Sequence, residues 1–358
     1  MRLLQHIILA IALALSLTAC TTVAQRENQV MIKYAKPGSE TPVSILADSR
    51  ALLRGYVKPA GVPLDLYRDV PEMATLAGYV YRGSTEIKSC PASPPLTFKT
   101  LPELRVHIPD KLIRPREGEN EEAASLPLYA QKALGLNRDY SVLSQTPDLL
   151  ASGLTYEVWQ RDQAGDIRDY AVVFRGTNLR SKGDWCANLR PFGLCRDQAS
   201  QFDQVRALTP ALIREIKSRA KADGKTPNVI AVGHSLGGAL AQKAAYTSDD
   251  IDLVFAFNAS PVLGYLDDDE VTGNVTGRNG LTIFRIFEAG EILAPVRAVI
   301  NSVKPLSSED PQIIILRYSL HSGLYPFVGL IENHNMVELA CGLRKVEQEV
   351  RTLEQSGL

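Results

Sequence analysis

One segment in the middle of the chain, residues 228–246, constrains the fold more than any other. It reads NVIAVGHSLGGALAQKAAY: a short apolar run, a serine between glycines, and an alanine-rich run. The apolar run predicts a buried strand, and the alanine-rich run predicts a helix. The glycines prevent clashes where strand and helix meet at a sharp turn. The segment therefore predicts a strand that passes directly into a helix at Ser235.

Strand and helix signals alternate on both sides of this segment. Continuous apolar runs, as buried strands show, occur within 167–177, 253–260 and 281–287. A further strand is expected over 154–162. Residues 199–224 place their apolar side chains at helical spacing and end in glycine. This alternation predicts an α/β fold with a mostly parallel central sheet flanked by helices.

The composition is that of a globular protein and argues against a polyanionic partner. The chain has 358 residues, of which 45% are hydrophobic and 22% are charged. This length corresponds to one large or two ordinary domains, each able to bury a core. Lys and Arg number 39 against 40 Asp and Glu, for a net charge of −1. Nucleic-acid-binding proteins usually carry a basic excess, so no nucleic-acid partner is expected.

The first twenty residues, MRLLQHIILAIALALSLTAC, have the pattern of an export signal. A basic residue precedes an apolar run, Ile7 to Leu17, that is too short to span a bilayer. The run ends in LTAC, which resembles the bacterial lipobox. That resemblance implies a signal peptide over 1–19 and acylation of Cys20, with an ordinary cleavage site or a buried segment as alternatives. Two threonines follow instead of an inner-membrane retention signal, which implies a lipid-anchored protein of the bacterial cell envelope, at the outer membrane facing the periplasm or the surface.

Four cysteines remain once Cys20 is set aside. An exported chain meets oxidising conditions, and four cysteines allow three disulfide pairings. Cys186 and Cys195 lie nine residues apart in one loop, which favours a local bond. Cys90 with Cys341 would then link the N-terminal region to the C-terminus. No Cys-x-x-Cys or His/Cys cluster indicates a metal site.

The turn at Ser235 also carries a chemical signal. Residues 233–237, GHSLG, match the pattern G-x-S-x-G between a strand and a helix. In that context the serine hydroxyl stands clear of the sheet and can act as a nucleophile. The next amide, Leu236 N–H, lies at the positively polarised start of a helix and can donate to a developing oxyanion.

Two stretches together resemble one known family. VIAVGHSLGGALA and VVFRGTN, residues 172–178, resemble the class 3 lipases of the α/β-hydrolase superfamily over residues 127–340. The resemblance implies an α/β-hydrolase fold, a lipid-like ester substrate and no cofactor. It also implies that Thr177, at the end of the FRGT strand, supplies the second oxyanion donor.

A serine nucleophile needs a histidine base, and the chain offers several histidines. The stretch NHNMVELACGL places His334 in a loop before a helix, which resembles the position of the family's base. His321 is the alternative. His107 precedes the hydrolase-like region, and His234 adjoins the serine and is expected to pack beneath the turn. A base in this position takes the serine proton and returns it to the leaving group.

The third member of such a triad is a carboxylate that orients the histidine. In this fold the chain order is nucleophile, acid, base. The family pattern of an acid, apolar residues and proline resembles IFEAGEILAPV, where Glu291 stands in place of the family's aspartate. Glu288 is a rival. The acidic run 267–270 is the other, although it reads more simply as a solvated loop.

These observations lead to one expected function and two alternatives. The expected function is a serine hydrolase that cleaves lipid or phospholipid acyl esters, bound to the membrane through its acyl anchor. The alternatives are an acyltransferase with the same triad, and a non-catalytic lipoprotein that binds lipid or protein. The expected segments are a signal peptide over 1–19, a lipidated tether over 20–45, an N-terminal region of unknown role over 46–125, the hydrolase-like domain over 126–345 and a C-terminal helix over 346–358.

Overall fold

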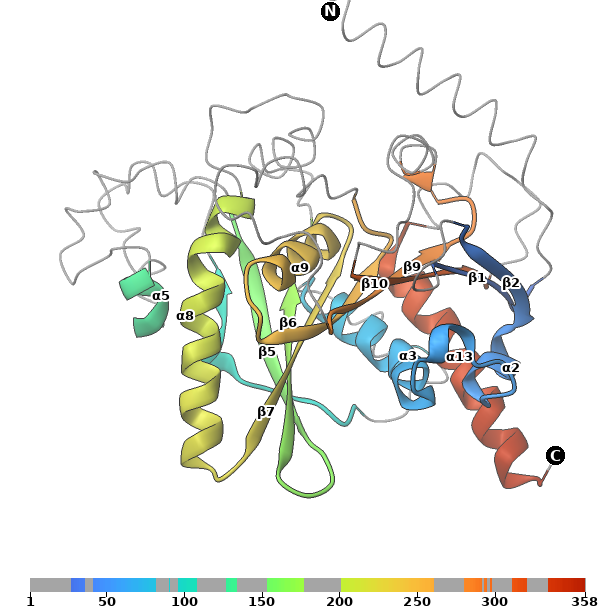
Figure 1. Ribbon diagram of the computed structural model, residues 1–358, viewed down its shortest axis with the longest axis horizontal. Helices are drawn as coiled ribbons and strands as arrows, with labels where there is room; N and C mark the ends of the chain where they lie inside the picture. The colour runs from blue at the N-terminus through green and yellow to red at the C-terminus, as the bar shows by residue number, and fades with distance from the viewer. Residues whose placement is uncertain are drawn as a thin grey trace, which may run out of the picture.

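The computed structural model of the protein shows a ten-stranded mixed sheet with helices packed on both faces (Figure 1). The central strands run parallel and the strands at both sides of them run antiparallel. The structure describes residues 27–35, 41–81, 90, 96–107, 127–133, 153–176, 201–260, 280–291, 293–294, 297, 311–320 and 334–357.

The centre of the sheet is a run of five parallel strands. They are, in chain order, β6 (Ile167–Phe174), β7 (Thr226–His234), β8 (Ile251–Phe257), β9 (Thr282–Glu288) and β10 (Gln312–Ser319). Each strand pairs with its predecessor, so all five carboxyl ends meet at one edge. Ligand sites of open α/β sheets lie at that edge. The expected mixed α/β architecture with a parallel core is confirmed, and the sequence analysis missed β10.

Antiparallel strands extend this core at both sides. β5 (Thr155–Asp162) pairs with β6 and is in turn paired with the short strands β3 (Lys99–Thr100) and β4 (Val106–His107). At the other side β1 (Gln29–Tyr34) pairs with β10, and β2 (Val43–Asp48) forms the edge. The expected tether over 20–45 is therefore wrong for β1 and the start of β2, which belong to the sheet.

Helices cover the two faces of the sheet in separate groups. One face carries α5 (Leu128–Ala133), α8 (Gln201–Ala222) and α9 (Leu236–Tyr246). The other carries α2 (Ser49–Leu53), α3 (Leu64–Tyr79) and α13 (Met336–Gln355). The short 3-10 turns η1 (Pro59–Gly61) and η2 (Pro102–Leu104) complete the described elements.

The central strands are buried on both faces, which explains their continuous apolar sequences. In β8, Val254 and Ala256 pack with the core beneath α8 and α9. Leu253, Phe255 and Phe257 pack with the core beneath α3 and α13. Successive side chains of a strand point to opposite faces, so a strand between two helical layers is apolar at nearly every position.

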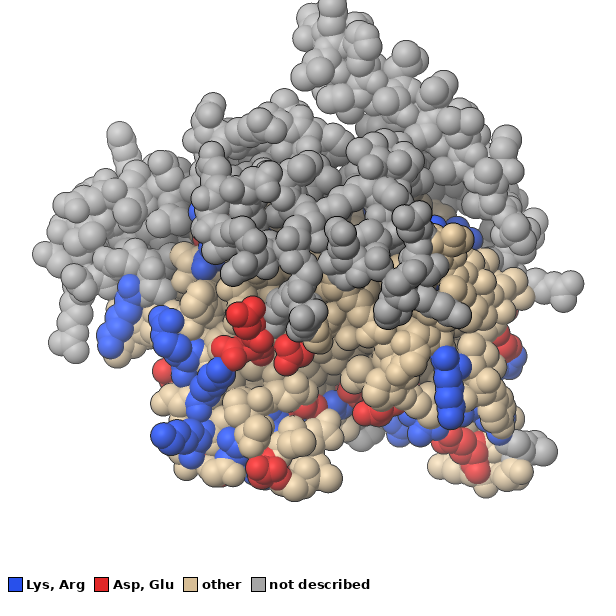
Figure 2. Space-filling model, viewed as in Figure 1, with Lys and Arg blue, Asp and Glu red and all other residues tan. Residues whose placement is uncertain are grey.

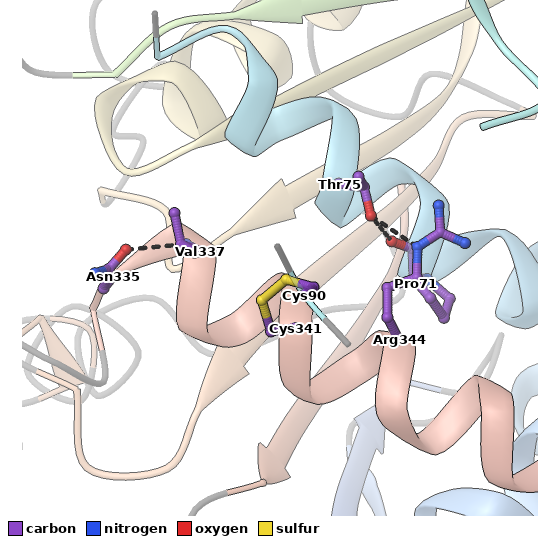
Figure 3. The surroundings of a disulfide bond; sticks show 7 residues. All are labelled: Pro71, Thr75, Cys90, Asn335, Val337, Cys341 and Arg344. Atoms are coloured by element: carbon purple, nitrogen blue, oxygen red, sulfur yellow. Dashed lines mark hydrogen bonds between the residues drawn. A yellow bond between two sulfur atoms is a disulfide. The ribbon is translucent and has the colours of Figure 1, made fainter. Parts of the chain in front are cut away.

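The expected C-terminal helix over 346–358 is only the second half of α13. The helix begins at Met336, where the side chain of Asn335 accepts a hydrogen bond from Val337 N at 2.9 Å (Figure 3). An N-cap of this kind satisfies one of the first amides, which have no partner within the helix. α13 is therefore part of the main fold and contributes buried side chains to its core.

The described part of the N-terminal region packs on the same sheet through α3. α3 contacts β7, β8 and α13. Between the helices, Arg344 Nε donates to Thr75 Oγ1 at 2.8 Å, and Thr75 Oγ1 donates to the carbonyl of Pro71 at 2.8 Å (Figure 3). α3 and α13, which are far apart in the sequence, thus share one helical layer.

The visible surface carries charges of both signs. On the face shown in Figure 2, Lys and Arg side chains are mixed with Asp and Glu side chains. Along α8 some of them pair, as between Arg219 and Glu215 and between Lys217 and Asp250. Among the described helices, none is both long enough and apolar enough to cross a membrane.

A disulfide joins Cys90 to Cys341 across the α3–α13 layer (Figure 3). The two Cα atoms are 5.4 Å apart and the residues are 251 positions apart in the sequence. This is one of the pairings that the sequence left open. Cys20, Cys186 and Cys195 lie outside the described residues, so their expected roles remain predictions.

We expect loss of this disulfide to lower stability. Closing a long loop restricts the unfolded chain, and removing a native disulfide typically costs about 2–5 kcal/mol. Denaturant unfolding of Cys341→Ser without reductant should show a loss of this order in the free energy of unfolding. Cys90→Ser should lose the same amount, and the double variant should lose no more. Equal stability of wild type and both single variants would contradict the expectation.

Candidate active site

Ser235 occupies a strained turn between β7 and α9. Its φ and ψ are 56° and −126°, a conformation that costs a non-glycine residue about 1–3 kcal/mol. Hydrogen bonds hold the backbone there: Ser235 N donates to Phe257 O at 2.9 Å, and Ser235 O accepts from Gly238 N at 3.1 Å and Ser260 N at 3.0 Å. The turn is therefore fixed by its neighbours on both sides.

The glycines around Ser235 are required by close backbone approach. A Cβ on Gly233 would overlap the carbonyl of Gly237, and one on Gly237 would overlap the carbonyl of Phe174 at the end of β6. A Cβ on Gly238 would lie 2.7 Å from the Cβ of Ala259. The glycines thus prevent clashes between strand and helix, as the sequence predicts, because only glycine lets the helix start this close to the strand ends.

His334 lies within hydrogen-bond distance of the serine. Its Nε2 is 3.0 Å from Ser235 Oγ. His334 precedes α13, whose N-cap residue Asn335 fixes the end of the loop. The expected base therefore lies where proton transfer from the serine hydroxyl is geometrically feasible. The alternative, His321, lies outside the described residues, and the side chain of His107 is not among the described ones.

Glu291 holds the other side of the His334 ring. Its Oε2 is 2.7 Å from His334 Nδ1 and accepts from Leu293 N at 3.0 Å. The carboxylate is fully buried, three residues beyond β9. An ionised carboxylate only accepts hydrogen bonds, so Nδ1 carries the proton and Nε2 is left to accept from Ser235. The structure thus joins a serine, a histidine and a carboxylate in one chain of hydrogen bonds.

The rival acid Glu288 points elsewhere. It is buried at the end of β9, and its Oε1 accepts a hydrogen bond from Leu320 N at 2.9 Å, next to β10. Its backbone amide donates to Asn258 Oδ1 at 3.0 Å. The described contacts of Glu288 therefore tie together three strand ends, and His334 is not among them. The acidic run 267–270 lies outside the described residues.

Arg297 is a site residue that the sequence analysis missed. Its Nη2 forms an ion pair with Glu291 Oε1, and its Nη1 donates to Ala259 O at 2.9 Å. Its guanidinium also lies 3.8 Å above the ring centre of Phe287. Arg297 thus holds the carboxylate oxygen that His334 leaves free. The only sequence signal for this ion pair is a basic residue six positions after Glu291. No general pattern predicts such a pair from that spacing.

The electrostatic surroundings keep His334 uncharged near neutral pH. Burial, and then the positive charge of Arg297, lower the pKa of His334 from 6.5 to about 4. Burial and the nearby His334 lower the pKa of His234 to about 3. Desolvation disfavours the charged form of an imidazole, and a nearby cation does the same. His334 is therefore available as a proton acceptor over a wide range of pH.

The expected oxyanion donors are only partly within the described residues. Leu236 N–H is the first amide of α9, and the first amides of a helix have no acceptor within it. Thr177 lies outside the described residues. Its neighbour Gly176 donates its amide hydrogen to Tyr81 Oη at 3.0 Å, so this amide already has an acceptor.

Tyr81 is a second residue that the sequence analysis missed. Its hydroxyl lies 2.9 Å from Nδ1 of His234, whose Nε2 lies 2.7 Å from the carbonyl oxygen of His334. His234 is buried beneath the turn, as expected. Tyr81 follows α3, 153 positions before His234, so no local pattern could have linked the two.

Nothing in the described ranges resembles a metal centre. Within them, no group of three or more His, Cys, Asp or Glu side chains is arranged to hold a metal ion. The described groups of the site are a hydroxyl, an imidazole, a carboxylate, a guanidinium and a helix-start amide.

We expect the His334 ring to titrate near pH 4. Histidine NMR signals, assigned by their loss in His334→Asn, would measure this pKa. Arg297→Gln should raise it, while Arg297→Lys should leave it low because the charge remains. The unfolded chain binds a proton on this ring near pH 6.5 and the folded chain only near 4. This ring therefore makes stability fall as the pH falls through that window. A pKa of 6.5 or above would contradict the assignment.

Comparison with known proteins adds one partial match. A family model described as a domain of unknown function, DUF6792, matches residues 158–267. The matched range is less than a third of the chain; it contains Ser235 and excludes Glu291 and His334. No curated protein matches the chain. The match names no activity, so a function has to be derived from the chemistry of the site.

Proposed function

We propose that the protein is a serine hydrolase that cleaves carboxylic esters through an acyl-enzyme. The observation that carries the proposal is the chain of contacts from Ser235 Oγ to His334 Nε2, 3.0 Å, and from His334 Nδ1 to Glu291 Oε2, 2.7 Å. A nucleophile, a base and a group that orients the base, in that order, activate a serine hydroxyl.

The reaction follows from the positions of these groups. Ser235 Oγ attacks the acyl carbonyl while His334 Nε2 accepts the hydroxyl proton. Glu291 stabilises the charged imidazole, and the Leu236 amide donates to the oxyanion of the tetrahedral intermediate. His334 then returns the proton to the leaving alcohol. Water, deprotonated by the same nitrogen, cleaves the acyl-enzyme and releases the acid.

The buried charges favour a neutral His334, which is the form that the proposed enzyme needs before it reacts. Glu291 is balanced by Arg297, so a neutral His334 completes an arrangement without net charge. The low pKa of His334 keeps the ring deprotonated at neutral pH, which is the form that can accept the serine proton. The active form should therefore dominate from neutral pH down to about pH 5.

The proposed substrate is a lipid-like ester, and the proposed location is the cell envelope. The substrate class rests on the resemblance to class 3 lipases, in which Thr177 would supply the second oxyanion donor. The anchor rests on the lipobox-like sequence that ends in Cys20. The Cys90–Cys341 disulfide supports an oxidising compartment outside the cytoplasm. An acyl anchor would bring the site to a membrane that contains acyl esters.

A fluorophosphonate probe tests for the nucleophile. We expect the probe to label the wild-type protein and Ser235→Ala to show no labelling. Ser260→Ala, which changes a second serine close to the turn, should still be labelled.

Hydrolysis of esters of graded chain length, a phospholipid included, would define the acyl preference. Product analysis with an added alcohol would reveal acyl transfer. A correctly folded wild type that neither reacts with the probe nor hydrolyses any ester would favour a non-catalytic binding protein.

The two buried glutamates provide a matched pair of variants. Glu291→Gln keeps the size of the side chain but no longer favours the Nδ1–H form of His334. We expect kcat to fall by at least about 100-fold, since an equivalent change in a Ser-His-Asp triad costs about 10⁴. Glu288→Gln should stay close to wild type in kcat. Equal losses in the two variants would reject Glu291 as the acid.

A further inference from the structure

The hydroxyl of Tyr81 lies where the N-terminal layer meets the candidate active site. Tyr81 follows α3, two residues after its last residue. Its hydroxyl oxygen is 3.0 Å from Gly176 N and 2.9 Å from His234 Nδ1. The rings of Tyr81 and His234 meet edge to face, with centres 5.7 Å apart. Tyr81 thus touches both the end of β6 and the residue before Ser235.

The direction of each hydrogen bond follows from what each atom can do. The carbonyl of His334 only accepts, so His234 Nε2 must carry a proton and donate to it over 2.7 Å. A neutral ring then has a bare Nδ1, which accepts from the Tyr81 hydroxyl. The Tyr81 oxygen in turn accepts from the Gly176 amide, which can only donate. All bonds of this chain are therefore mutually consistent for a neutral His234.

This chain of hydrogen bonds connects three backbone segments whose relative positions matter for the proposed reaction. Gly176 precedes Thr177, the expected oxyanion donor. His234 precedes the nucleophile, and the carbonyl at the other end belongs to His334, whose ring contacts Ser235 Oγ. A shift of about 1 Å in a catalytic group can cost about 100-fold in rate. A link that fixes these three positions is therefore expected to affect the chemical step.

The residues around the Tyr81 hydroxyl leave room for it. A Cβ on Gly176 would overlap the Tyr81 hydroxyl and lie 2.5 Å from the His234 carbonyl oxygen, so the approach requires glycine at 176. Cys90, nine positions after Tyr81, is bonded to Cys341 in α13. The same helix begins two residues after His334. The N-terminal layer is thus tied to the base region by a hydrogen-bond chain and by a covalent bond.

We propose that Tyr81 and His234 are positioning residues, which hold the oxyanion strand end, the serine turn and the backbone of His334 in register for hydrolysis. The roles rest on the proposed function, but the hydrogen-bond chain itself does not. Tyr81→Phe removes the hydroxyl and keeps the ring. It leaves the Gly176 amide without its tyrosine acceptor and His234 Nδ1 without its tyrosine donor.

The kinetic test compares two tyrosines of one structural layer. We expect Tyr81→Phe to lower kcat about 10- to 100-fold with little change in KM, because ground-state binding does not depend on this link. Tyr67→Phe is the matched control: Tyr67 is buried in α3, and its hydroxyl donates to Pro59 O at 3.0 Å, away from the site. It should affect Tm but leave kcat at the wild-type value. Wild-type kcat in Tyr81→Phe, or an equal loss in Tyr67→Phe, would overturn the proposal.

A spectroscopic test begins with the wild-type protein and needs no activity. In protein with ¹⁵N-labelled histidine, we expect His234 to carry its proton on Nε2 and His334 to carry its proton on Nδ1. In Tyr81→Phe the nitrogen signals of His234 should shift. A wild-type His234 protonated on Nδ1 would overturn the proposal whatever the activity. If the tautomers are as expected but no ester is hydrolysed and no probe reacts, the proposed function fails while the hydrogen-bond chain stands.

Discussion

The close approach of backbones at the start of α9 is the constraint on which the rest of the site depends. The helix begins so near the strand ends that Gly233, Gly237 and Gly238 have no room for a Cβ. This approach forces Ser235 into a strained conformation, which its hydrogen bonds to Phe257 at the end of β8 and to Ser260 beyond it hold in place. Strain of this kind persists only where the surroundings over-determine it. Two neighbouring parallel strands and a helix supply that restraint here.

The same geometry decides where the charged groups can lie. Parallel strands end at one edge, so residues that follow β7 and β9 meet there although they are 56 positions apart. Glu291 is fully buried at that edge, and an isolated buried carboxylate would be very costly. Arg297 and the Nδ1–H of His334 offset that cost from two sides. Burial, and then the positive charge of Arg297, lower the pKa of His334, which weakens the ring as a base and keeps it uncharged at neutral pH.

Local sequence signals predicted the parts of the fold that local physics determines. The turn at Ser235 and the strands β6, β8 and β9 follow from glycines and apolar runs. β10 carries a comparable signal in its run of apolar residues, Ile313 to Leu316, but was not among the predicted strands. β1 was hidden by its half-buried alternation in a polar stretch.

The contacts of Tyr81 and Arg297 could not be predicted, since they arise from packing between distant or irregular segments. Glu291 and His334 were reached through resemblance to a family, because their spacing alone left rivals open. In the structure Glu288 Oε1 accepts from Leu320 N beside β10, whereas Glu291 Oε2 contacts His334 Nδ1.

The part of the chain that matches a family model is chemically incomplete by itself. Residues 158–267 contain Ser235 and Leu236, but the proposed base His334 and the proposed acid Glu291 come from later segments, and Tyr81 comes from an earlier one. A serine turn without these neighbours has a strained backbone and a hydroxyl with no base. Another protein that matches this range can share the proposed chemistry only if its other segments supply equivalents of Glu291 and His334. Whether it also has an equivalent of Tyr81 decides whether its serine turn is held in the same way.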